Sequence, residues 1–245
     1  MPPSAKIRID QLLLARGLAD SRQKAQALIL AGSIVVNGQK EDKPGHTVPA
    51  DAEVAVLEKM PYVSRGGYKL AGALDHWNIS IDGKLCIDVG ASTGGFTDCL
   101  LQRGAAKVFA IDVGHGQLDW KLRNDPRVEV REGVNARHLD PEDFPLPFDL
   151  AVCDASFISL TMLIPAAARL LKPEGEMIVL VKPQFEVEKG QVGRGGIVRD
   201  PALHQAACDR VIAAFNAQRF HSELIDSPIL GAEGNREFLA YARRV

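Results

Sequence analysis

Two neighbouring stretches of the sequence carry residues that could bind a nucleoside. Apolar residues 85–89 predict a buried strand, and a turn of small residues, Gly90-Ala91-Ser92-Thr93-Gly94-Gly95, leads from it into a predicted helix. Glycine lets the backbone approach a ligand closely, and a helix N-terminus offers unpaired N–H groups. A second apolar strand, residues 108–111, ends at Asp112, whose carboxylate could accept hydrogen bonds from ribose hydroxyls. The two stretches together predict a nucleoside-cofactor site on a Rossmann-like sheet.

Two charged residues follow two further apolar strands. Residues 150–153 end at Asp154, and residues 177–181 end at Lys182. The carboxyl ends of parallel strands open onto one edge of a doubly wound sheet, so this acid and this lysine should lie beside the turn at Gly90. Two alternatives remain at this point. The pair could be a structural ion pair that caps the sheet, and the turn could be a tight strand-to-helix connection that binds no ligand.

Strands and helices alternate through the rest of the C-terminal part. Residues 65–77 predict a helix with Leu70, Leu74 and Trp77 in one apolar stripe, and Lys69 lies off that stripe. Further strands are predicted at residues 128–130, 220–229 and 237–241, and further helices at 159–171 and 201–218, with a break at 172–175. Such alternation predicts an α/β fold whose mostly parallel sheet is covered on both faces.

The N-terminal residues form a separate predicted unit. A first helix starts near Ile9 and stops at Gly17, and Ser21 is a good N-cap for a second helix. Residues 33–36 then predict a short strand that enters an Asn37-Gly38 turn, and residues 53–57 predict another strand. Seven basic and four acidic residues between Lys6 and Lys43 leave this segment with a charge of +3.

The length, composition and net charge of the chain exclude several classes of protein. A length of 245 residues with 46% apolar residues can bury a sizeable core, and the net charge of −2 gives no global sign of nucleic-acid binding. The four cysteines are widely spaced without a C-x-x-C motif, so we expect reduced thiols and no metal site. Neither an apolar signal core at the N-terminus nor a stretch near the roughly 20 apolar residues of a membrane helix is present, and we expect a cytoplasmic protein.

The N-terminal unit resembles the S4 RNA-binding domain. The resemblance rests on Arg8-Ile9-Asp10 before the first helix, Ser21-Arg22 at the start of the second, and Gly32-Ser33-Ile34-Val35-Val36-Asn37-Gly38. In that family the basic residues of the helices contact RNA phosphates, which position a protein without reading sequence. The resemblance implies RNA contacts for Arg8, Arg22 and Lys24, and we expect Arg65 to contribute as well. A solvated charged face on a small helical unit is the alternative.

The C-terminal part is similar to methyltransferases that use S-adenosylmethionine (SAM). Asp88, inside the strand before the turn, matches their first motif, and Lys69, Asp154, Lys182 and Glu237 match the Lys-Asp-Lys-Glu tetrad of FtsJ-like ribose 2′-O-methyltransferases. Together with the S4-like unit, four further motifs make the chain similar to the TlyA family, whose members are named both hemolysins and 16S/23S rRNA (cytidine-2′-O)-methyltransferases: Ser64–Leu70, Asp112–Leu118, Lys182–Glu186 and Gly234–Phe238.

This resemblance implies a division of the chain and a set of functional residues. We expect an α+β S4-like domain at residues 1–59, a linker at 60–64, and a Rossmann-like methyltransferase domain with a seven-stranded sheet at 65–245. Ribosomal RNA or ribosomal subunits would be the partner, with no role for a membrane or a metal. The expected tetrad is catalytic, and the residues expected to bind SAM are Asp88, Gly90, Ala91, Ser92, Gly94, Phe96, Asp112 and Asn135.

The tetrad suggests a mechanism for methylating a poor nucleophile. Lys182 could take the proton of a ribose 2′-OH only as a neutral amine. Lys69 and partial desolvation favour the neutral form, whereas Asp154 and Glu237 favour the charged form while orienting the amine. The sequence does not decide between these effects. Our hypothesis makes Lys182 the base or proton relay, oriented by Asp154 and Glu237, with Lys69 steering the ribose.

Three other functions are compatible with parts of the sequence. A membrane-lytic protein would need an apolar span or a strongly amphipathic basic helix, and neither is evident. An RNA-binding protein without catalysis would not require the tetrad, and a small-molecule methyltransferase would leave the S4-like unit without a purpose. The short linker suggests a further hypothesis, that RNA docking is coupled to the SAM site. Substitutions at Val63 or Arg65 would test it.

Overall fold

The structure is a computed structural model that describes residues 5–57, 60–145, 147–231 and 234–244. The chain divides into two compact units, Met1–Pro61 and Tyr62–Val245. Each unit has a hydrophobic core of its own.

The first unit combines two helices with short antiparallel strands. Ser21 caps the second helix as predicted, because its Oγ accepts a hydrogen bond from the Lys24 N–H at 3.2 Å. Asn37 and Gly38 both have positive φ angles, 48° and 80°, and form the predicted hairpin turn. The elements are β1 (Lys6–Arg8), α1 (Ile9–Ala15), α2 (Arg22–Leu30), β2 (Ile34–Val36), β3 (Gln39–Glu41), β4 (Thr47–Pro49) and β5 (Val54–Val56).

These strands form two small sheets, β1 with β4 and β3-β2-β5. The sequence did not predict β1, β3 or β4, since each of these three-residue strands has at most one aliphatic residue, whereas β2 and β5 are apolar throughout. Both helices pack on the sheets through buried Ile9, Leu13 and Ile29, which meet Ile34 of β2.

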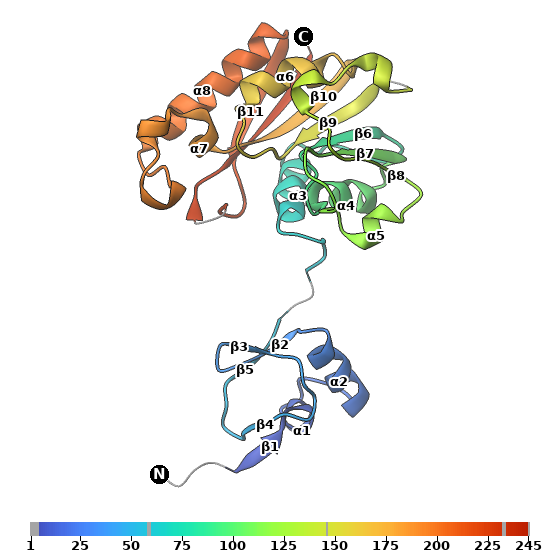
Figure 1. Cartoon of the computed structure of the whole chain (residues 1–245), viewed down its shortest axis with the longest axis vertical. Helices are drawn as coiled ribbons and strands as arrows, with labels where there is room; N and C mark the ends of the chain where they lie inside the picture. The colour runs from blue at the N-terminus through green and yellow to red at the C-terminus, as the bar shows by residue number, and fades with distance from the viewer. Residues whose placement is uncertain (1–4, 58–59, 146, 232–233, 245) are drawn as a thin grey trace. The chain divides into compact units, whose positions relative to one another are not determined.

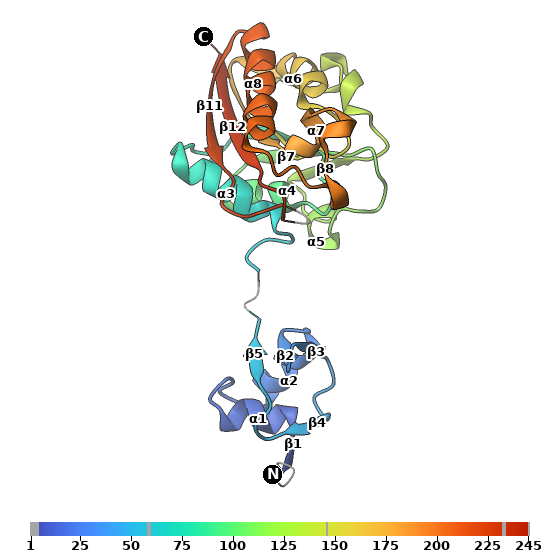
Figure 2. The same ribbon diagram turned by 90° about the vertical axis from the view of Figure 1, so that its left-hand side faces the viewer.

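The second unit is built on the predicted seven-stranded, mostly parallel sheet, in the order β11-β12-β10-β9-β6-β7-β8. Every strand pair is parallel except the two made by β12, which runs antiparallel to both β10 and β11. Figure 2 shows β11 and β12 side by side at one end of the sheet. The strands are β6 (Leu85–Val89), β7 (Lys107–Ile111), β8 (Val128–Arg131), β9 (Phe148–Cys153), β10 (Leu171–Val181), β11 (Phe220–Asp226) and β12 (Phe238–Arg244).

Helices cover both faces of this sheet (Figure 1). Cys86 packs with α3, α4 and α5 on one face, and the next residue, Ile87, packs with α6 and α8 on the other, as expected for a strand buried on both sides. The helices are α3 (Gly66–His76), α4 (Gly95–Gln102), α5 (Trp120–Arg123), α6 (Leu160–Ala168), α7 (Pro183–Glu186) and α8 (Pro201–Ala217), with 3₁₀ turns η1 (Ala136–His138), η2 (Pro141–Asp143), η3 (Lys189–Gln191) and η4 (Arg194–Gly196).

Some predicted boundaries are wrong. Helix α6 ends at Ala168, and β10 already begins at Leu171, so the predicted break at 172–175 lies within a strand. The residues of this predicted break disturb the strand without ending it, because the pairing of β10 with β9 shifts register between Leu171 and Glu176. β12 runs on to Arg244 because β11 pairs with it along its whole length, and β11 stops at Asp226, shortly before Pro228.

The order of the strands places the carboxyl ends of β6 and β9 at a switch point. After β6 the chain builds β7 and β8 on one side, and it then crosses to build β9 on the other side. A ligand crevice in a doubly wound sheet forms at such a point. Because β12 is antiparallel and Phe238 pairs with Val181, the start of β12 lies at this same edge.

Candidate functional site

The turn after β6 contacts the ends of both neighbouring strands. The N–H groups of Gly90 and Ala91 donate to the carbonyl of Ile111, at 2.8 and 3.1 Å. Gly90 has a φ of +85°, and a β-carbon added there would lie 2.9 Å from the backbone oxygen of Asp154. Only glycine therefore fits between β6 and the loop that follows β9.

The Asp112 carboxylate organises two loops at this edge. Its Oδ2 accepts from the Ser92 N–H and its Oδ1 from the Gly114 N–H, both at 2.7 Å. Asp112 is half-buried, and each carboxylate oxygen can accept more than one hydrogen bond, so the group can also receive a ligand hydroxyl.

A pocket opens beside this turn. Predicted residues from the turn line it together with Lys69 and Asp154. Ser64, the first residue of the Ser64–Leu70 motif, also lies in the wall. Its Oγ fills the space where a β-carbon at Gly95 would sit, at 2.2 Å. The lining residues are Ser64, Gly66, Lys69, Gly90, Ala91, Ser92, Thr93, Gly95, Phe96 and Asp154.

Four of the predicted cofactor residues are not part of this lining in the described structure. Gly94 is the N-cap residue of α4 and packs close to Leu122 and Leu118, and Asp112 acts through its bonds to the turn. Asn135 caps its own 3₁₀ turn by accepting from the Arg137 N–H at 3.1 Å.

The fourth, Asp88, lies behind the turn. It is fully buried, and its Oδ2 accepts from the Thr97 hydroxyl of α4 at 2.6 Å. Its Oδ1 finds no hydrogen-bond partner among the described residues. Burial raises the pKa of this carboxyl group to about 7. Asp88 thus joins the strand to the helix on either side of the turn.

The predicted tetrad is assembled as two ion pairs. Lys69 Nζ lies 2.6 Å from Glu237 Oε2, and both residues are buried. Lys182 Nζ lies 2.6 Å from Asp154 Oδ1. Glu237 therefore contacts Lys69 and not Lys182, so the structure gives no direct contact for the role of orienting Lys182 that we expected of it.

Lys182 has a further partner that the sequence reasoning missed. Its Nζ donates a hydrogen bond to Ser156 Oγ at 2.9 Å, and Ser156 stands in the exposed loop between Asp154 and α6. The next residue, Phe157, is 90% exposed with a φ of +64°, and its ring centre lies 5.1 Å from that of Phe185. An exposed aromatic residue in a backbone conformation that L-residues rarely adopt is typical of a functional loop.

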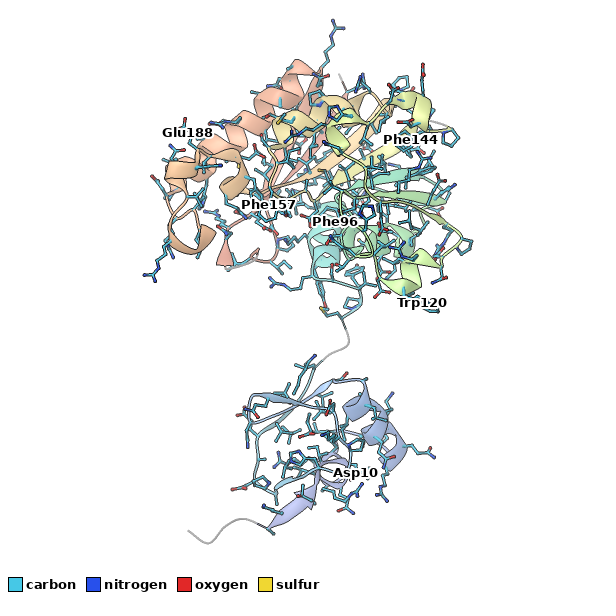
Figure 3. The ribbon with its side chains drawn as sticks, in the orientation of Figure 1. Asp10, Phe96, Trp120, Phe144, Phe157 and Glu188 are labelled. Atoms are coloured by element: carbon cyan, nitrogen blue, oxygen red, sulfur yellow. The ribbon has the colours of Figure 1, made fainter. Side chains whose placement is uncertain are left out.

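Two predicted RNA-binding residues of the first unit, Arg8 and Arg22, are held by a buried carboxylate. Asp10 is fully buried within this unit (Figure 3) and accepts from Arg8 Nε and Nη2, from Arg22 Nε at 3.2 Å and from Gln26 Nε2. These hydrogen bonds, that of Arg8 first, lower the pKa of Asp10. The guanidinium groups of Arg8 and Arg22 are thus fixed in direction while remaining partly exposed.

The other two predicted RNA-binding residues differ in setting. Lys24 is exposed on α2, and Arg65, in the second unit, is exposed and donates to the carbonyl of Leu230.

In the described part of the chain, no helix is long and apolar enough to cross a membrane. The same residues contain no group of three or more His, Cys, Asp or Glu side chains that could hold a metal ion.

Comparison with known proteins agrees with both units. The family profile described as "FtsJ-like methyltransferase" matches residues 62–244, and the S4 domain profile matches residues 7–54. The 16S/23S rRNA (cytidine-2′-O)-methyltransferase TlyA of Mycobacterium tuberculosis is 46% identical, with 97% of this chain and 90% of that protein covered. Hemolysin A of Brachyspira hyodysenteriae is 43% identical, with 96% of this chain and 99% of that protein covered.

A solved structure agrees with the fold. A candidate hemolysin from Streptococcus thermophilus, 44% identical, superposes with a TM-score of 0.76 over 98% of this chain and 89% of that one. The expected resemblance is therefore confirmed over nearly the whole sequence, and the chain belongs to the TlyA family of FtsJ-like methyltransferases.

Proposed function

We propose that this protein transfers a methyl group from SAM to a ribose 2′-OH of ribosomal RNA. Cytidine in 16S or 23S rRNA, or in both, within ribosomal subunits in the cytoplasm is the proposed substrate. The observation that carries the proposal is the ion pair of Lys182 with Asp154, because Asp154 lines the pocket next to the Gly90 turn.

The residues at this edge fit SAM. SAM has a ribose and a charged amino-acid tail. The ribose suits the carboxylate of Asp112, and the tail suits a backbone turn free of large side chains. Helix α4 follows this turn, and no side chain caps its N-terminus, because its N-cap residue is Gly94. We assign Gly90, Ala91, Ser92 and Phe96 to the wall of the cofactor site, Asp112 to the ribose hydroxyls and Asn135 to the vicinity of the adenine. Gly94 and Asp88 would shape the turn. Bound SAM would supply an electrophilic methyl group.

The protein's own contribution is to position and deprotonate the hydroxyl. Lys182 is the base or proton relay, and Asp154 holds its amine at the edge of the pocket. Lys69, whose charge is balanced by Glu237, lines the same pocket and would steer the ribose. Holding two reactants in line can lower a barrier by about 7–11 kcal/mol, so positioning would provide much of the rate.

RNA contacts would come from the first unit and from Arg65. Arg8 and Arg22 present guanidinium groups whose direction is set by Asp10, and Lys24 adds a charge on the same α2 helix as Arg22. Such groups suit phosphates of the RNA backbone.

The proposal is tested with methyl-labelled SAM and unmodified 30S and 50S subunits. Wild-type protein should label rRNA ribose, and Lys182→Ala should lower the rate about 100-fold or more, since general bases contribute about that much. Lys172→Ala is the matched control, because Lys172 begins the same strand and forms an ion pair with Asp149 away from the pocket. Wild-type turnover in Lys182→Ala would contradict the assignment, and absence of label with wild type would contradict the function.

A further inference from the structure

The amine of Lys182 has two neighbours of different character. Asp154 Oδ1 is 2.6 Å away, yet this oxygen finds no partner in hydrogen-bond geometry among the described residues. While Lys182 carries its proton this contact is an ion pair, which attracts the ammonium group without fixing its direction. Ser156 Oγ, at 2.9 Å, accepts a directed hydrogen bond from the same nitrogen.

A directed bond matters for an amine that acts as a base. A neutral lysine amine has two N–H bonds and one lone pair, and it can rotate about its terminal C–N bond. When one N–H is held by an acceptor, that rotation is restricted and the lone pair points in a restricted direction. The group that accepts this hydrogen bond therefore sets where a proton can be taken from.

The loop that carries Ser156 is fixed to the segment that carries Lys182. Glu186, which is buried, accepts from the Ser159 hydroxyl at 2.6 Å and from the Leu160 N–H at 2.8 Å, so its carboxylate caps α6. Between these bonds and the Lys182 contacts, Phe157 packs on Phe185. Residues 154–160 and 182–186 are thus joined at three successive points, which fix Ser156 opposite the amine.

We propose that Ser156 is a positioning residue for methyl transfer, because its hydroxyl oxygen aligns the lone pair of Lys182 with the substrate hydroxyl. This inference rests on the proposed function of the site. Ser156 stands outside the lining of the pocket by the Gly90 turn, so it acts on the rate of transfer and not on cofactor affinity.

The test compares Ser156→Ala with Ser156→Thr in single-turnover methylation of ribosomal subunits. Loss of one hydrogen bond should lower the maximal rate of Ser156→Ala about tenfold. Its affinity for SAM, measured by calorimetry, and its KM for subunits should stay within about twofold of wild type. Threonine keeps the hydroxyl, and Ser156→Thr should recover most of the rate.

Several results would overturn the inference. These are an unchanged rate in Ser156→Ala, a loss that appears only in KM for the subunits, or an equal loss in the alanine and threonine variants. Because Ser156 is exposed, we expect both variants to keep the thermal midpoint of wild type. Wild-type protein in the same assay separates the two hypotheses, since lack of transfer by wild type would contradict the proposed function itself.

Discussion

Asp88 shows how a single buried carboxyl group can make stability depend on pH. Its pKa is raised to about 7 in the folded protein because burial penalises the charged form, whereas the unfolded chain has the ordinary value of 3.8. Between these values the folded state binds the extra proton, so the free energy of unfolding falls as pH rises from about 4 to 7. A shift of this size corresponds to at most about 4 kcal/mol.

Asp88→Asn should remove this dependence. Asparagine is neutral at all these pH values and can still accept from the Thr97 hydroxyl. The variant should gain stability over wild type at pH 8, and the gain should shrink towards pH 5. Urea unfolding of both proteins at several pH values measures the difference. A constant difference across that range would show that Asp88 is not protonated in the folded protein.

At the scale of residues, the strand ends predicted one contact of the site, and the other contacts depended on packing. Asp154 and Lys182 could be placed together because both follow strands of a parallel sheet. The pairing of Glu237 with Lys69 could not be predicted, since it depends on where α3 packs against the start of β12. Ser156 could not be found for a similar reason, because serine is common in loops and its role depends on the path of one loop.

At the scale of elements, the segment before α3 is attached to the helix that follows the Gly90 turn. The Val63 N–H donates to Asp98 Oδ2 of α4 at 2.9 Å, and Ser64 lies in the pocket wall. This contact supports the hypothesis that the linker region is coupled to the cofactor site, because a displaced Ser64 would change the pocket.

Asp98→Ala should therefore weaken SAM binding, by about three- to tenfold for the loss of the Val63 hydrogen bond. The substitution also removes the hydrogen bond from Gln102 and the ion pair with Lys121. Asp98→Asn keeps an oxygen that can accept from Val63 and should bind SAM nearly as well as wild type. Isothermal titration calorimetry measures both affinities. Equal affinity in wild type and Asp98→Ala would contradict the coupling.

Long periodic segments gave reliable predictions of elements, and short or interrupted ones did not. The strands β6, β7, β9 and the helix α8 were found because each is a continuous apolar or amphipathic segment with clear ends. The start of β10 was missed, since Lys172, Pro173 and Gly175 are typical of a loop. In this segment, the pairing of β10 with β9 on both sides of the register shift outweighs the preference of these residues for a loop.

At the scale of the whole molecule, we expect RNA affinity not to follow net charge. The chain carries −2 overall, while residues 6–43 carry +3, so RNA binding would depend on the direction of a few basic groups. Asp10→Asn raises the net charge by one unit, and general electrostatics predicts tighter RNA binding. We expect weaker binding instead, because Arg8 and Arg22 lose the carboxylate that holds them.

Asp20→Asn is the matched control, since Asp20 is exposed and its loss makes the same change in charge. Affinity for rRNA fragments at fixed salt, by filter binding, compares the three proteins. Tighter binding by both variants would contradict a positioning role for Asp10. Far-UV circular dichroism checks that Asp10→Asn stays folded, because breaking a buried ion pair costs about 3–5 kcal/mol.

The inner position of β12 has a consequence for folding of the chain during its synthesis on the ribosome. β12 is the last strand of the sheet to be synthesised, yet it lies between β10 and β11 and contributes buried Leu239, Ala240 and Ala242. Until it emerges, β11 has no strand to pair with and an apolar slot stays open to solvent, which makes the nascent chain a natural client for chaperones. Glu237 arrives with the same segment, so Lys69 obtains its counter-charge only when translation of the domain is nearly complete.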